Sequence, residues 1–402
     1  MEIVKEHIAN KVSAPKLRFK EFNELMDKHE FSELVEKRNK THNPINDNTN
    51  YKCIELESLS QETGILLNTF ETKNLKSTKT KFKSGDVLFG KLRPYLKKFH
   101  IPKFDGVCTS EIWVLNGIKL QNKYLYQLIQ TPKFNIEANI TSGSKMPRAD
   151  WNYISSIKYY TPTLPEQEKI ASFLSAVDER IQKLERKKSL LAAYKKGVMR
   201  QLFSQELRFK DEHGNNYPDW EEKKLGEVGE IVNGLTYSPN DIGEGGVLVL
   251  RSSNVQNRTI TFNDNVFVNT SSFNAVKKDD VLICVRNGSK RLIGKNAIIT
   301  TDCEGMAFGA FMTVYRSCYN PFLFHWFDTD GFKNEVHKNL GATINSINGS
   351  DLKKFKIPLP CVEEQQKTAN FLSALDVKIE AVNAQIENTQ AFKKGLLQQM
   401  FV

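Results

Sequence analysis

The sequence predicts an α+β protein in which one unit is used twice. The stretch 165–203 has the pattern of a long amphipathic helix, and a second copy of it occupies 363–401. A constant offset of 198 residues aligns the copies without a gap, and 16 of the 38 positions from Glu166 to Phe203 are identical. Strand and helix signals alternate between the two copies without βαβ regularity, which favours α+β over a doubly wound sheet.

Composition and charge restrict the class of partner. A chain of 402 residues with 40% hydrophobic and 10% aromatic content is large enough for two or three domains with apolar cores. The formal net charge of +10 favours a polyanionic partner such as nucleic acid, although a generically basic soluble protein has the same balance. The six cysteines form no Cys-x-x-Cys pair, which is typical of reduced thiols in a cytoplasmic protein. No apolar run reaches the roughly 18 residues of a membrane span, so no membrane partner is expected.

The two globular regions show the same order of elements. In the first region, strands are expected at 51–59, 86–92 and 111–115 and a helix at 123–130. In the second region, 277–283 corresponds to 83–89, and the helical pattern at 321–328 corresponds to 123–130. The residues 247–250 predict one more strand. Prolines end each region and prepare the start of the long helix.

A short lead-in segment precedes each globular region. Leu17-Arg18-Phe19 stands before the first region, and Leu207-Arg208-Phe209 follows directly after the first long helix. Each unit therefore has the order lead-in, globular region, long helix. This cyclic order implies that the beginning and the end of the chain lie close together in space.

Apolar residues recur along each long helix at intervals of three and four residues, as in a coiled coil. At about 1.5 Å per residue, such a helix spans roughly 52 Å, which one compact domain does not cover. The natural partner is the other copy, in an antiparallel intramolecular coiled coil with a pseudo-two-fold repeat; packing of each helix on its own domain is the alternative. The expected coiled-coil core residues are Phe173, Leu174, Val177, Ile181, Leu184, Leu191, Val198, Phe371, Leu372, Leu375, Ile379, Val382, Ile386 and Leu396.

Some of the identical helix positions carry polar or small residues. Asp178 and the run Lys195-Lys196-Gly197 recur in the second copy. A charged run is often only a solvated face. Its repetition also fits a surface that docks the same partner twice, and both interpretations stay open at this point.

Several loops combine cations with aromatic or amide side chains. The stretch 73–103 contains ten Lys or Arg residues and one acid, Asp86. Cations neutralise phosphates, and Arg and Asn side chains read guanine and adenine in the major groove. Solubilising surface turns are the alternative for any single residue. The candidate DNA-contact residues are Lys91, Arg93, Tyr95, Lys97, Lys98, Ser144, Lys145, Arg148, Arg251, Asn254, Arg286, Asn287, Lys290 and Arg291.

Catalytic patterns are incomplete. Residues 218–223 contain the letters of a metal-dependent nuclease motif, but both halves crowd into six positions, where they cannot lie on neighbouring strands around one metal ion. Asn320-Pro321-Phe322 is one proline short of an amino-methyltransferase loop, and no Gly-rich cofactor motif precedes it. No catalytic or metal-binding residue is therefore expected.

The ordered, duplicated elements resemble the specificity (S) subunit of type I restriction-modification systems. The resemblance covers essentially the whole chain and departs from the pattern only mildly in the second copy, with Glu363 in place of Pro165 and Thr389 in the seam. The stretches that carry it are 162–171 with Phe173, Leu174 and Asp178, their copies at 358–376, 195–203 with its copy, Leu17-Arg18-Phe19 and Pro218-x-Trp220.

The resemblance implies a division into four parts. Target recognition domains at 1–164 and 205–360 would each read one half of a bipartite target in double-stranded DNA. Conserved spacer helices at 165–204 and 361–402 would set the gap between the halves. A coiled-coil scaffold with basic domains and no sequence reading is the rival interpretation.

The resemblance also implies partners. Two methyltransferase (M) subunits would dock on the helices and domains, and two restriction (R) subunits would join them in the full complex. S-adenosylmethionine, ATP and Mg²⁺ would belong to those partners. This chain itself is expected to bind no cofactor and to be a non-catalytic recognition subunit.

Overall fold

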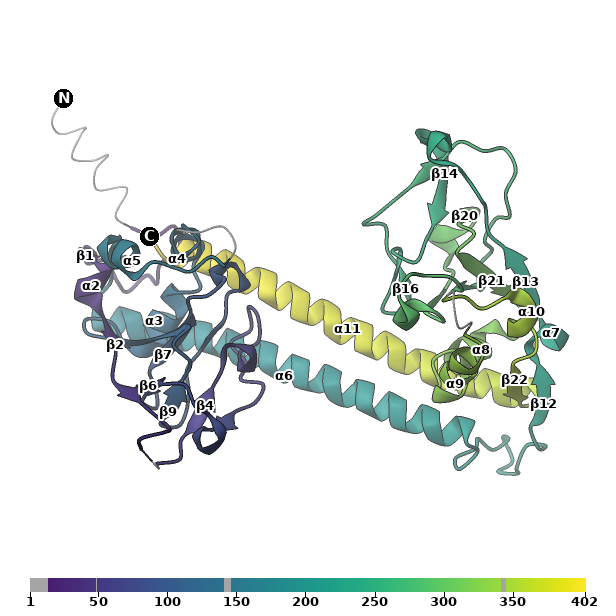
Figure 1. Cartoon of the computed structure of the whole chain (residues 1–402), viewed down its shortest axis with the longest axis horizontal. Helices are drawn as coiled ribbons and strands as arrows, with labels where there is room; N and C mark the ends of the chain where they lie inside the picture. The colour runs from purple at the N-terminus through teal and green to yellow at the C-terminus, as the bar shows by residue number, and fades with distance from the viewer. Residues whose placement is uncertain (1–13, 48, 141–145, 341–344) are drawn as a thin grey trace. The chain divides into compact units, whose positions relative to one another are not determined.

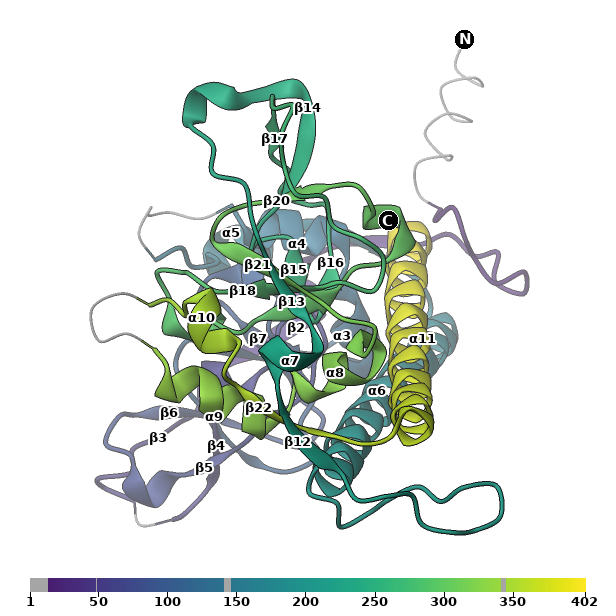
Figure 2. The ribbon, with the colours of Figure 1, turned by 90° about the vertical axis from the view of Figure 1, so that its right-hand side faces the viewer.

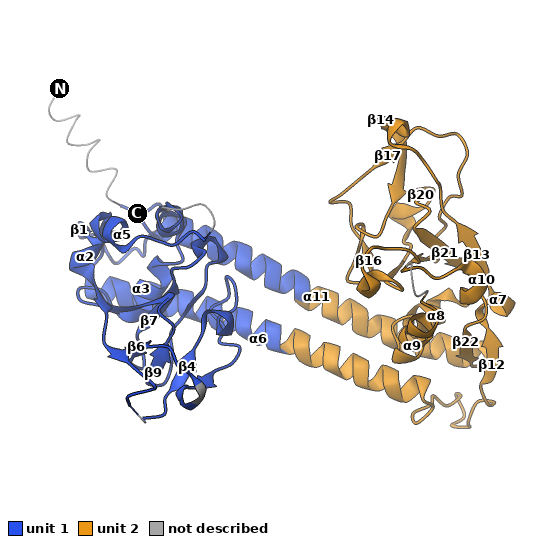
Figure 3. Ribbon diagram, viewed as in Figure 1, with its two compact units in different colours: residues 1–186, 383–402 blue, residues 187–382 orange. Residues whose placement is uncertain are grey.

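The computed structural model describes residues 14–47, 49–140, 146–340 and 345–402. The chain divides into two compact units (Figure 3). Unit 1 consists of residues 1–186 and 383–402, and unit 2 consists of residues 187–382. Each unit contains one globular region and one segment of each long helix, so neither globular region is separate from the helices.

Unit 1 contains a four-stranded antiparallel sheet with the order β2-β10-β7-β8. Its strands are β2 (Val35–Arg38), β10 (Ile112–Gly117), β7 (Val87–Gly90) and β8 (Phe99–His100). A second sheet has the order β3-β6-β9-β4-β5, with strands Thr41–His42, Lys79–Phe82, Gly106–Cys108, Lys52–Ile54 and Phe70–Glu71. Strands β1 (Asp27–Glu30) and β11 (Lys158–Thr161) pair and join the beginning of the globular region to its end. The helices and 3-10 turns are α2 (Phe31–Leu34), η1 (Leu56–Ser58), η2 (Thr72–Asn74), η3 (Pro94–Leu96), α3 (Asn122–Leu128), α4 (Pro132–Ala138) and α5 (Trp151–Ser156).

Unit 2 repeats this framework. The four-stranded order is β13-β21-β18-β19, with strands Glu230–Asn233, Met312–Arg316, Val281–Cys284 and Asn296–Ile298. Strands β12 (Glu221–Lys224) and β22 (Lys356–Leu359) pair as β1 and β11 do. The helices and 3-10 turns are α7 (Leu225–Val228), η4 (Pro239–Asp241), η5 (Lys290–Leu292), η6 (Thr301–Cys303), α8 (Asn320–Trp326), α9 (Asp330–Lys338) and α10 (Gly349–Leu352).

The units differ in their additional strands. In place of the five-stranded sheet, unit 2 has the order β17-β14-β20 and the pair β15-β16. These strands are Phe267–Val268, Ile242–Leu250, Ala307–Phe308, Val255–Gln256 and Thr259–Ile260. Figures 1 and 2 show β14, and Figure 2 also shows β17, on the side of unit 2 away from α9 and β22. The strand predicted at 247–250 is the end of β14.

Repeated local signals form the shared framework. Asp86 and Asp280 each accept a main-chain N–H at 2.8 Å, from Lys83 and Lys277, in the turns that start β7 and β18. The hydroxyls of Thr131 and Thr329, which are 198 residues apart, cap α4 and α9 by accepting the third N–H of each helix. The helix predicted at 123–130 is observed as α3, and its counterpart as α8. The strand expected at 51–59 is shorter, because β4 ends at Ile54 and the turn η1 follows.

The two long helices are α6 (Leu164–Phe203) and α11 (Val362–Met400). Within unit 1, residues from the beginning of α6, such as Ile170 and Leu174, share one apolar core with Leu397 and Met400 from the end of α11. Within unit 2, Leu202 from the end of α6 clusters with Leu372 from the beginning of α11. The helix segments therefore run antiparallel in each unit, and the predicted α+β fold with two long antiparallel helices is confirmed.

The expected coiled-coil positions differ in burial. The buried ones are Leu174, Val177, Ile181, Val198, Leu372, Leu375, Val382, Ile386 and Leu396. Leu184, Leu191, Phe371 and Ile379 are only partly buried. Phe173 is 38% exposed and packs edge-on against Phe19, at 5.9 Å between ring centroids. Its placement in the coiled-coil core is wrong, because this ring covers the lead-in segment.

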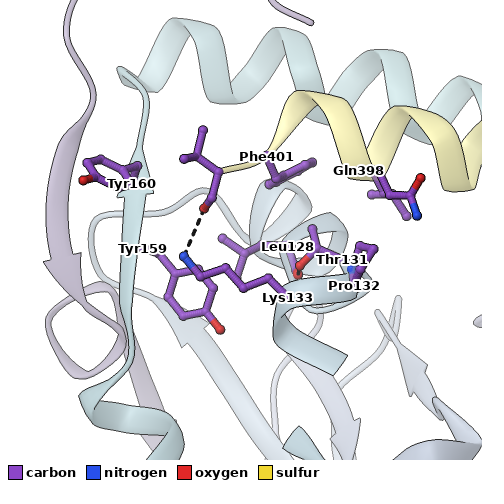
Figure 4. A pocket seen from close by; sticks show the side chains of 10 residues that line it. Leu128, Thr131, Pro132, Lys133, Tyr159, Tyr160, Gln398 and Phe401 are labelled. Atoms are coloured by element: carbon purple, nitrogen blue, oxygen red, sulfur yellow. Dashed lines mark hydrogen bonds between the residues drawn. The ribbon is translucent and has the colours of Figure 1, made fainter. Parts of the chain in front are cut away.

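The beginning of the described chain contacts the end of α11, as the cyclic order predicts. The N–H of Leu17 donates to the carbonyl of Gln399 at 2.9 Å, and that of Leu207 donates to the carbonyl of Gln201 at 3.1 Å. The same contact is thus made twice, once between distant residues and once within a continuous stretch. In unit 1, Nζ of Lys133 also donates to the main-chain oxygen of Val402 at 3.3 Å, beside the ring of Phe401 (Figure 4).

Candidate DNA interface and its support

Two loops and the start of β10 meet in unit 1. The N–H of Lys91 donates to the carbonyl of Glu111 at 2.9 Å, and the carbonyl of Lys91 accepts the N–H of Ala149 at 2.9 Å. The N–H of Arg93 donates to Pro147 at 2.7 Å. We call residues 91–98, 111 and 146–149 the unit 1 interface. It brings Arg148 next to the candidate loop that contains Lys91 and Arg93.

The backbone of this first loop is strained. Arg93 and Lys97 have φ values of 50° and 47°, in the left-handed region that non-glycine residues seldom adopt. They enclose the short turn η3, on which Tyr95 is 53% exposed. Such strain persists where the surrounding contacts hold the backbone, so the loop presents Tyr95 from a fixed frame.

The charged side chains of the unit 1 interface differ in their availability. Arg148 donates from Nε and Nη2 to the two carboxylate oxygens of Glu111, at 3.0 and 3.1 Å, and this pairing raises the pKa of Arg148. Lys97 pairs with Glu62 at 2.6 Å, and Lys98 donates to the carbonyl of Leu56 at 2.8 Å. These two ammonium groups are therefore engaged within the chain. No ion pair among the described residues includes Lys91 or Arg93, and Ser144 and Lys145 lie outside the described residues.

Unit 2 has the same backbone arrangement. The N–H groups of Val285 and Arg286 both donate to the carbonyl of Phe311, at 3.0 and 3.1 Å. Residues 286 and 346 form a bridge, as residues 92 and 148 do in unit 1. We call residues 285–291, 311 and 345–347 the unit 2 interface. The guanidinium of Arg286 lies 5.7 Å from the centroid of the Phe311 ring.

The remaining candidates in unit 2 fall into two groups. Lys290 and Arg291 are exposed on η5, whereas Asn254 is fully buried. The Asn254 amide donates to the carbonyls of Thr261 and Asp264, so its assignment as a DNA-contact residue is wrong; it holds its own loop.

Two further candidates connect neighbouring loops. Arg251 pairs with Asp264 at 2.9 Å. The amide of Asn287 donates to the hydroxyl of Ser252 at 3.1 Å and joins the 251–254 loop to the unit 2 interface.

The lead-in segments hold each globular region on the start of a long helix. The guanidinium of Arg18 donates twice to the carboxylate of Glu166, at 2.8 and 2.7 Å, and the Glu166 side chain is fully buried. In unit 2, Arg208 donates twice to Glu364 at 3.2 and 2.8 Å. The indole of Trp220 adds a third bond to Glu364 at 2.9 Å. Two parallel hydrogen bonds from a guanidinium offset the desolvation cost of burying a carboxylate.

The glutamine of each helix start joins the same support. The side chain of Gln167 donates to the carbonyl of Pro162 at 2.9 Å, and that of Gln365 donates to Pro360 at 2.7 Å. The duplicated Glu-Gln pair therefore binds the lead-in segment and the end of the globular region, both of which precede it in the chain. This accounts physically for the motif on which the sequence resemblance depends.

A lysine of one long helix pairs with an aspartate of the other in each unit. Lys393 contacts Asp178 at 2.6 Å in unit 1, and Lys195 contacts Asp376 at 2.5 Å in unit 2. Both lysines are buried, and burial lowers the pKa of Lys393. The repetition of these four residues is explained by internal pairing, without an external partner. Lys196 and Lys394 are exposed and keep the docking interpretation open.

Sequence reasoning missed two residues of the interfaces, Glu111 and Phe311. Each stands one position before a strand, β10 or β21, that pairs with the strand leading into the candidate loop. No signal in the sequence points to Phe311, because its 57% exposure is a property of the folded chain. Glu111 was visible only as the first residue of an expected strand.

In the described part of the chain, no helix combines the length and the apolar character that a membrane span requires. No group of three metal-ligating side chains was found among the same residues. All six cysteines are unpaired.

Comparisons with known proteins agree with this architecture. The family model described as "Type I restriction modification DNA specificity domain" matches residues 23–192 and again 217–389. The MjaVIII specificity subunit of Methanocaldococcus jannaschii, a type I restriction enzyme subunit, is 28% identical over 327 residues, which are 73% of this chain and 76% of the relative. The EcoKI specificity subunit of Escherichia coli is 26% identical over 190 residues, 44% of this chain and 41% of that protein.

Solved structures share the fold. A chain from a study of complex assembly in a type I R-M system has a TM-score of 0.56 at 20% identity and covers 95% of this chain and 98% of its own length. The S subunit of a type I restriction-modification system from M. genitalium has a TM-score of 0.56 at 16% identity, with 97% and 99% covered.

The fold and the two family matches define a class of protein, in which a duplicated DNA specificity module is carried on two long helices. The chain belongs to the family of type I restriction-modification DNA specificity subunits. Its role is DNA sequence recognition, and membership in this family assigns it to recognition rather than to catalysis.

Proposed function

We propose that unit 1 and unit 2 each read one half of a bipartite sequence in double-stranded DNA, while α6 and α11 set the gap. The supporting observation is that both interfaces use the same backbone hydrogen bonds, from residues 91–93 and 285–287, but carry different side chains. A fixed frame with changed side chains suits two modules that approach DNA in the same way and read different bases.

The proposal extends to the partner subunits. Each unit has a groove between its long helices and one short helix, of about 480 Å³ beside α4 and about 1010 Å³ beside α9. Most residues that line one groove have counterparts 198 positions away in the other, including Lys394 with Lys196 and Leu397 with Met199. Repeated grooves support the docking of two copies of one partner, the methyltransferase subunit.

Two restriction subunits would complete the assembly in the cytoplasm. S-adenosylmethionine, ATP and Mg²⁺ would be bound by the partner subunits. The four-part division at residues 164, 204 and 360 remains our proposal for where modules are exchanged.

Methylome sequencing of cells that carry the full system tests the proposal. We expect a bipartite, asymmetric methylated motif. Replacing residues 12–164 by those of a relative should change one half of the motif only, and removing matched turns from α6 and α11 should change only the gap. Uniform, salt-sensitive binding to random DNA without an enriched motif would instead support the scaffold interpretation.

A further inference from the structure

The residue directly before β10 in unit 1 and the residue directly before β21 in unit 2 are of different types. In unit 1 it is Glu111, one residue before β10, and in unit 2 it is Phe311, one residue before β21. Both positions are structurally equivalent, because each carbonyl accepts an N–H from the candidate loop, from Lys91 or from Val285. The side chains therefore project from the same place on the same frame.

Each of the two side chains is paired with an arginine, but the arginine comes from a different loop. Glu111 binds Arg148, which lies in the second loop of unit 1. Phe311 lies under Arg286, which belongs to the first loop of unit 2. The β-bridges show which positions correspond. Leu92 of the first loop pairs with Arg148 of the second loop in unit 1, and Arg286 of the first loop pairs with Ser346 of the second loop in unit 2. The arginine therefore lies on opposite sides of the bridge in the two units.

Solvent exposure distinguishes residues 111 and 311 from buried residues that only support the fold. Phe311 is 57% exposed, so the ring does not serve the core of unit 2. The side chain of Glu111 is 26% exposed and that of Arg148 is 44% exposed. A ring and a carboxylate offer different chemistry to a base pair: Phe makes apolar contact with the thymine methyl group, whereas a carboxylate accepts from the amino group of cytosine and Arg reads guanine.

We propose that residues 111 and 311 are specificity-determining positions, one for each half of the DNA target. This inference rests on the proposed function and adds to it the residues that distinguish the halves. Phe311 contacts a base pair that carries a thymine methyl group. Glu111 acts with Arg148 on a base pair that offers both an amino donor and guanine acceptors.

Reciprocal substitutions test the inference in the full chain with its partner subunits. Phe311→Glu should change one base pair in the half read by unit 2, with a loss of about 10- to 100-fold for the original sequence in competition binding. The half read by unit 1 and the gap should stay unchanged. Glu111→Phe should give the opposite pattern, and Glu111→Gln, which keeps the shape of the side chain, should relax the same base pair as Glu111→Phe.

Phe392→Ala is the matched control, since Phe392 is equally exposed, at 55%, but lies on α11. It should leave both halves of the motif unchanged. Thermal unfolding of every variant verifies that the fold is kept. Wild-type methylomes without a bipartite motif would refute the proposed function itself.

Two outcomes would overturn only the further inference. One is an unchanged motif in folded Phe311→Glu and Glu111→Phe chains. The other is reduced assembly with the methyltransferase subunit at unchanged specificity, which would make Phe311 a protein contact.

Discussion

Unit 1 and unit 2 are alike where the lead-in segment meets the long helix and differ where the candidate loops meet the sheet. Arg18 with Glu166 and Arg208 with Glu364 form the same buried, bidentate pair. At the interfaces, Glu111 has been exchanged for Phe311, and the arginine has moved from one loop to the other. Backbone contacts and buried pairs therefore fix the frame, while exposed side chains on that frame are free to change.

The largest expected effect concerns the shared frame. Arg18→Ala leaves the carboxylate of Glu166 buried without its cation, and Arg208→Ala does the same to Glu364. Breaking a buried pair by removing one partner costs about 3 kcal/mol or more in the free energy of unfolding. We expect a similar loss in both variants, each confined to its own unit, as measured by hydrogen exchange of peptides from unit 1 and unit 2.

Lys20→Ala and Lys210→Ala are the matched controls, because each removes an exposed cation two residues after the lead-in arginine. They should change the stability by no more than about 0.5 kcal/mol. If Arg18→Ala and Arg208→Ala were as mild as these controls, the lead-in segments would not hold the units together.

The second effect concerns a buried residue that differs between the units. His325 of α8 occupies the position that Gln127 occupies in α3, 198 residues earlier. The amide of Gln127 donates to Asp178 at 2.9 Å. His325 lies with Nδ1 3.9 Å from Asp376 and Nε2 3.2 Å from the hydroxyl of Ser373. Burial, with Lys195 and Arg258 nearby, lowers the pKa of His325 to about 3.

The lowered pKa of His325 makes unit 2 sensitive to acid. Between pH 6.5 and 3 the unfolded chain protonates this imidazole and the folded chain does not, so stability is lost as the pH falls through this range. From pH 7 to pH 5 the loss is about 2 kcal/mol. His325→Gln, which installs the residue of unit 1, should remove this part of the pH dependence in urea unfolding.

The exposed His337 of α9 provides the control. His337→Gln should keep the full pH dependence of unit 2. Equal slopes of stability against pH in the wild type and in His325→Gln would show that the pKa of His325 is the same in the folded and the unfolded chain, which would contradict the lowered pKa.

The sequence predicted the parts of the fold that repeat, and it did so because repetition is visible without coordinates. The long helices, the cyclic order and the start of β7 and β18 follow from patterns such as Lys-Ser-Gly-Asp at 83–86. The apolar seam of the long helices was predicted only in part. The spacing of apolar residues does not show whether a ring packs between the two helices or, like Phe173, against Phe19 of the lead-in segment. Short strands such as β4 were misjudged where a 3-10 turn continued the apolar run.

The candidate interface was harder to predict, because a side chain type does not reveal its hydrogen-bond partners. Asn254 has the chemistry of an adenine reader, yet its amide is used to close its own loop. Lys195 looked like a surface cation and is buried against Asp376. Phe311, which the sequence does not set apart from other aromatic residues, is exposed. In each case the tertiary environment, and not the residue type, decides the role.

The smallest expected effect concerns Gly197 of α6 and Gly395 of α11, which are repeat counterparts next to the exposed Lys196 and Lys394. A Cβ atom added to either glycine meets no atom within 4 Å in the described structure. Glycine inside a helix costs about 0.5 to 1 kcal/mol relative to alanine, so Gly197→Ala and Gly395→Ala should each stabilise the chain by that amount in thermal unfolding. If the stabilised variants assemble normally with the methyltransferase subunit, the glycines serve no close contact. Weaker assembly at higher stability would place the partner's surface directly against these two helix positions and so locate the repeated docking site on the exposed faces of the helices.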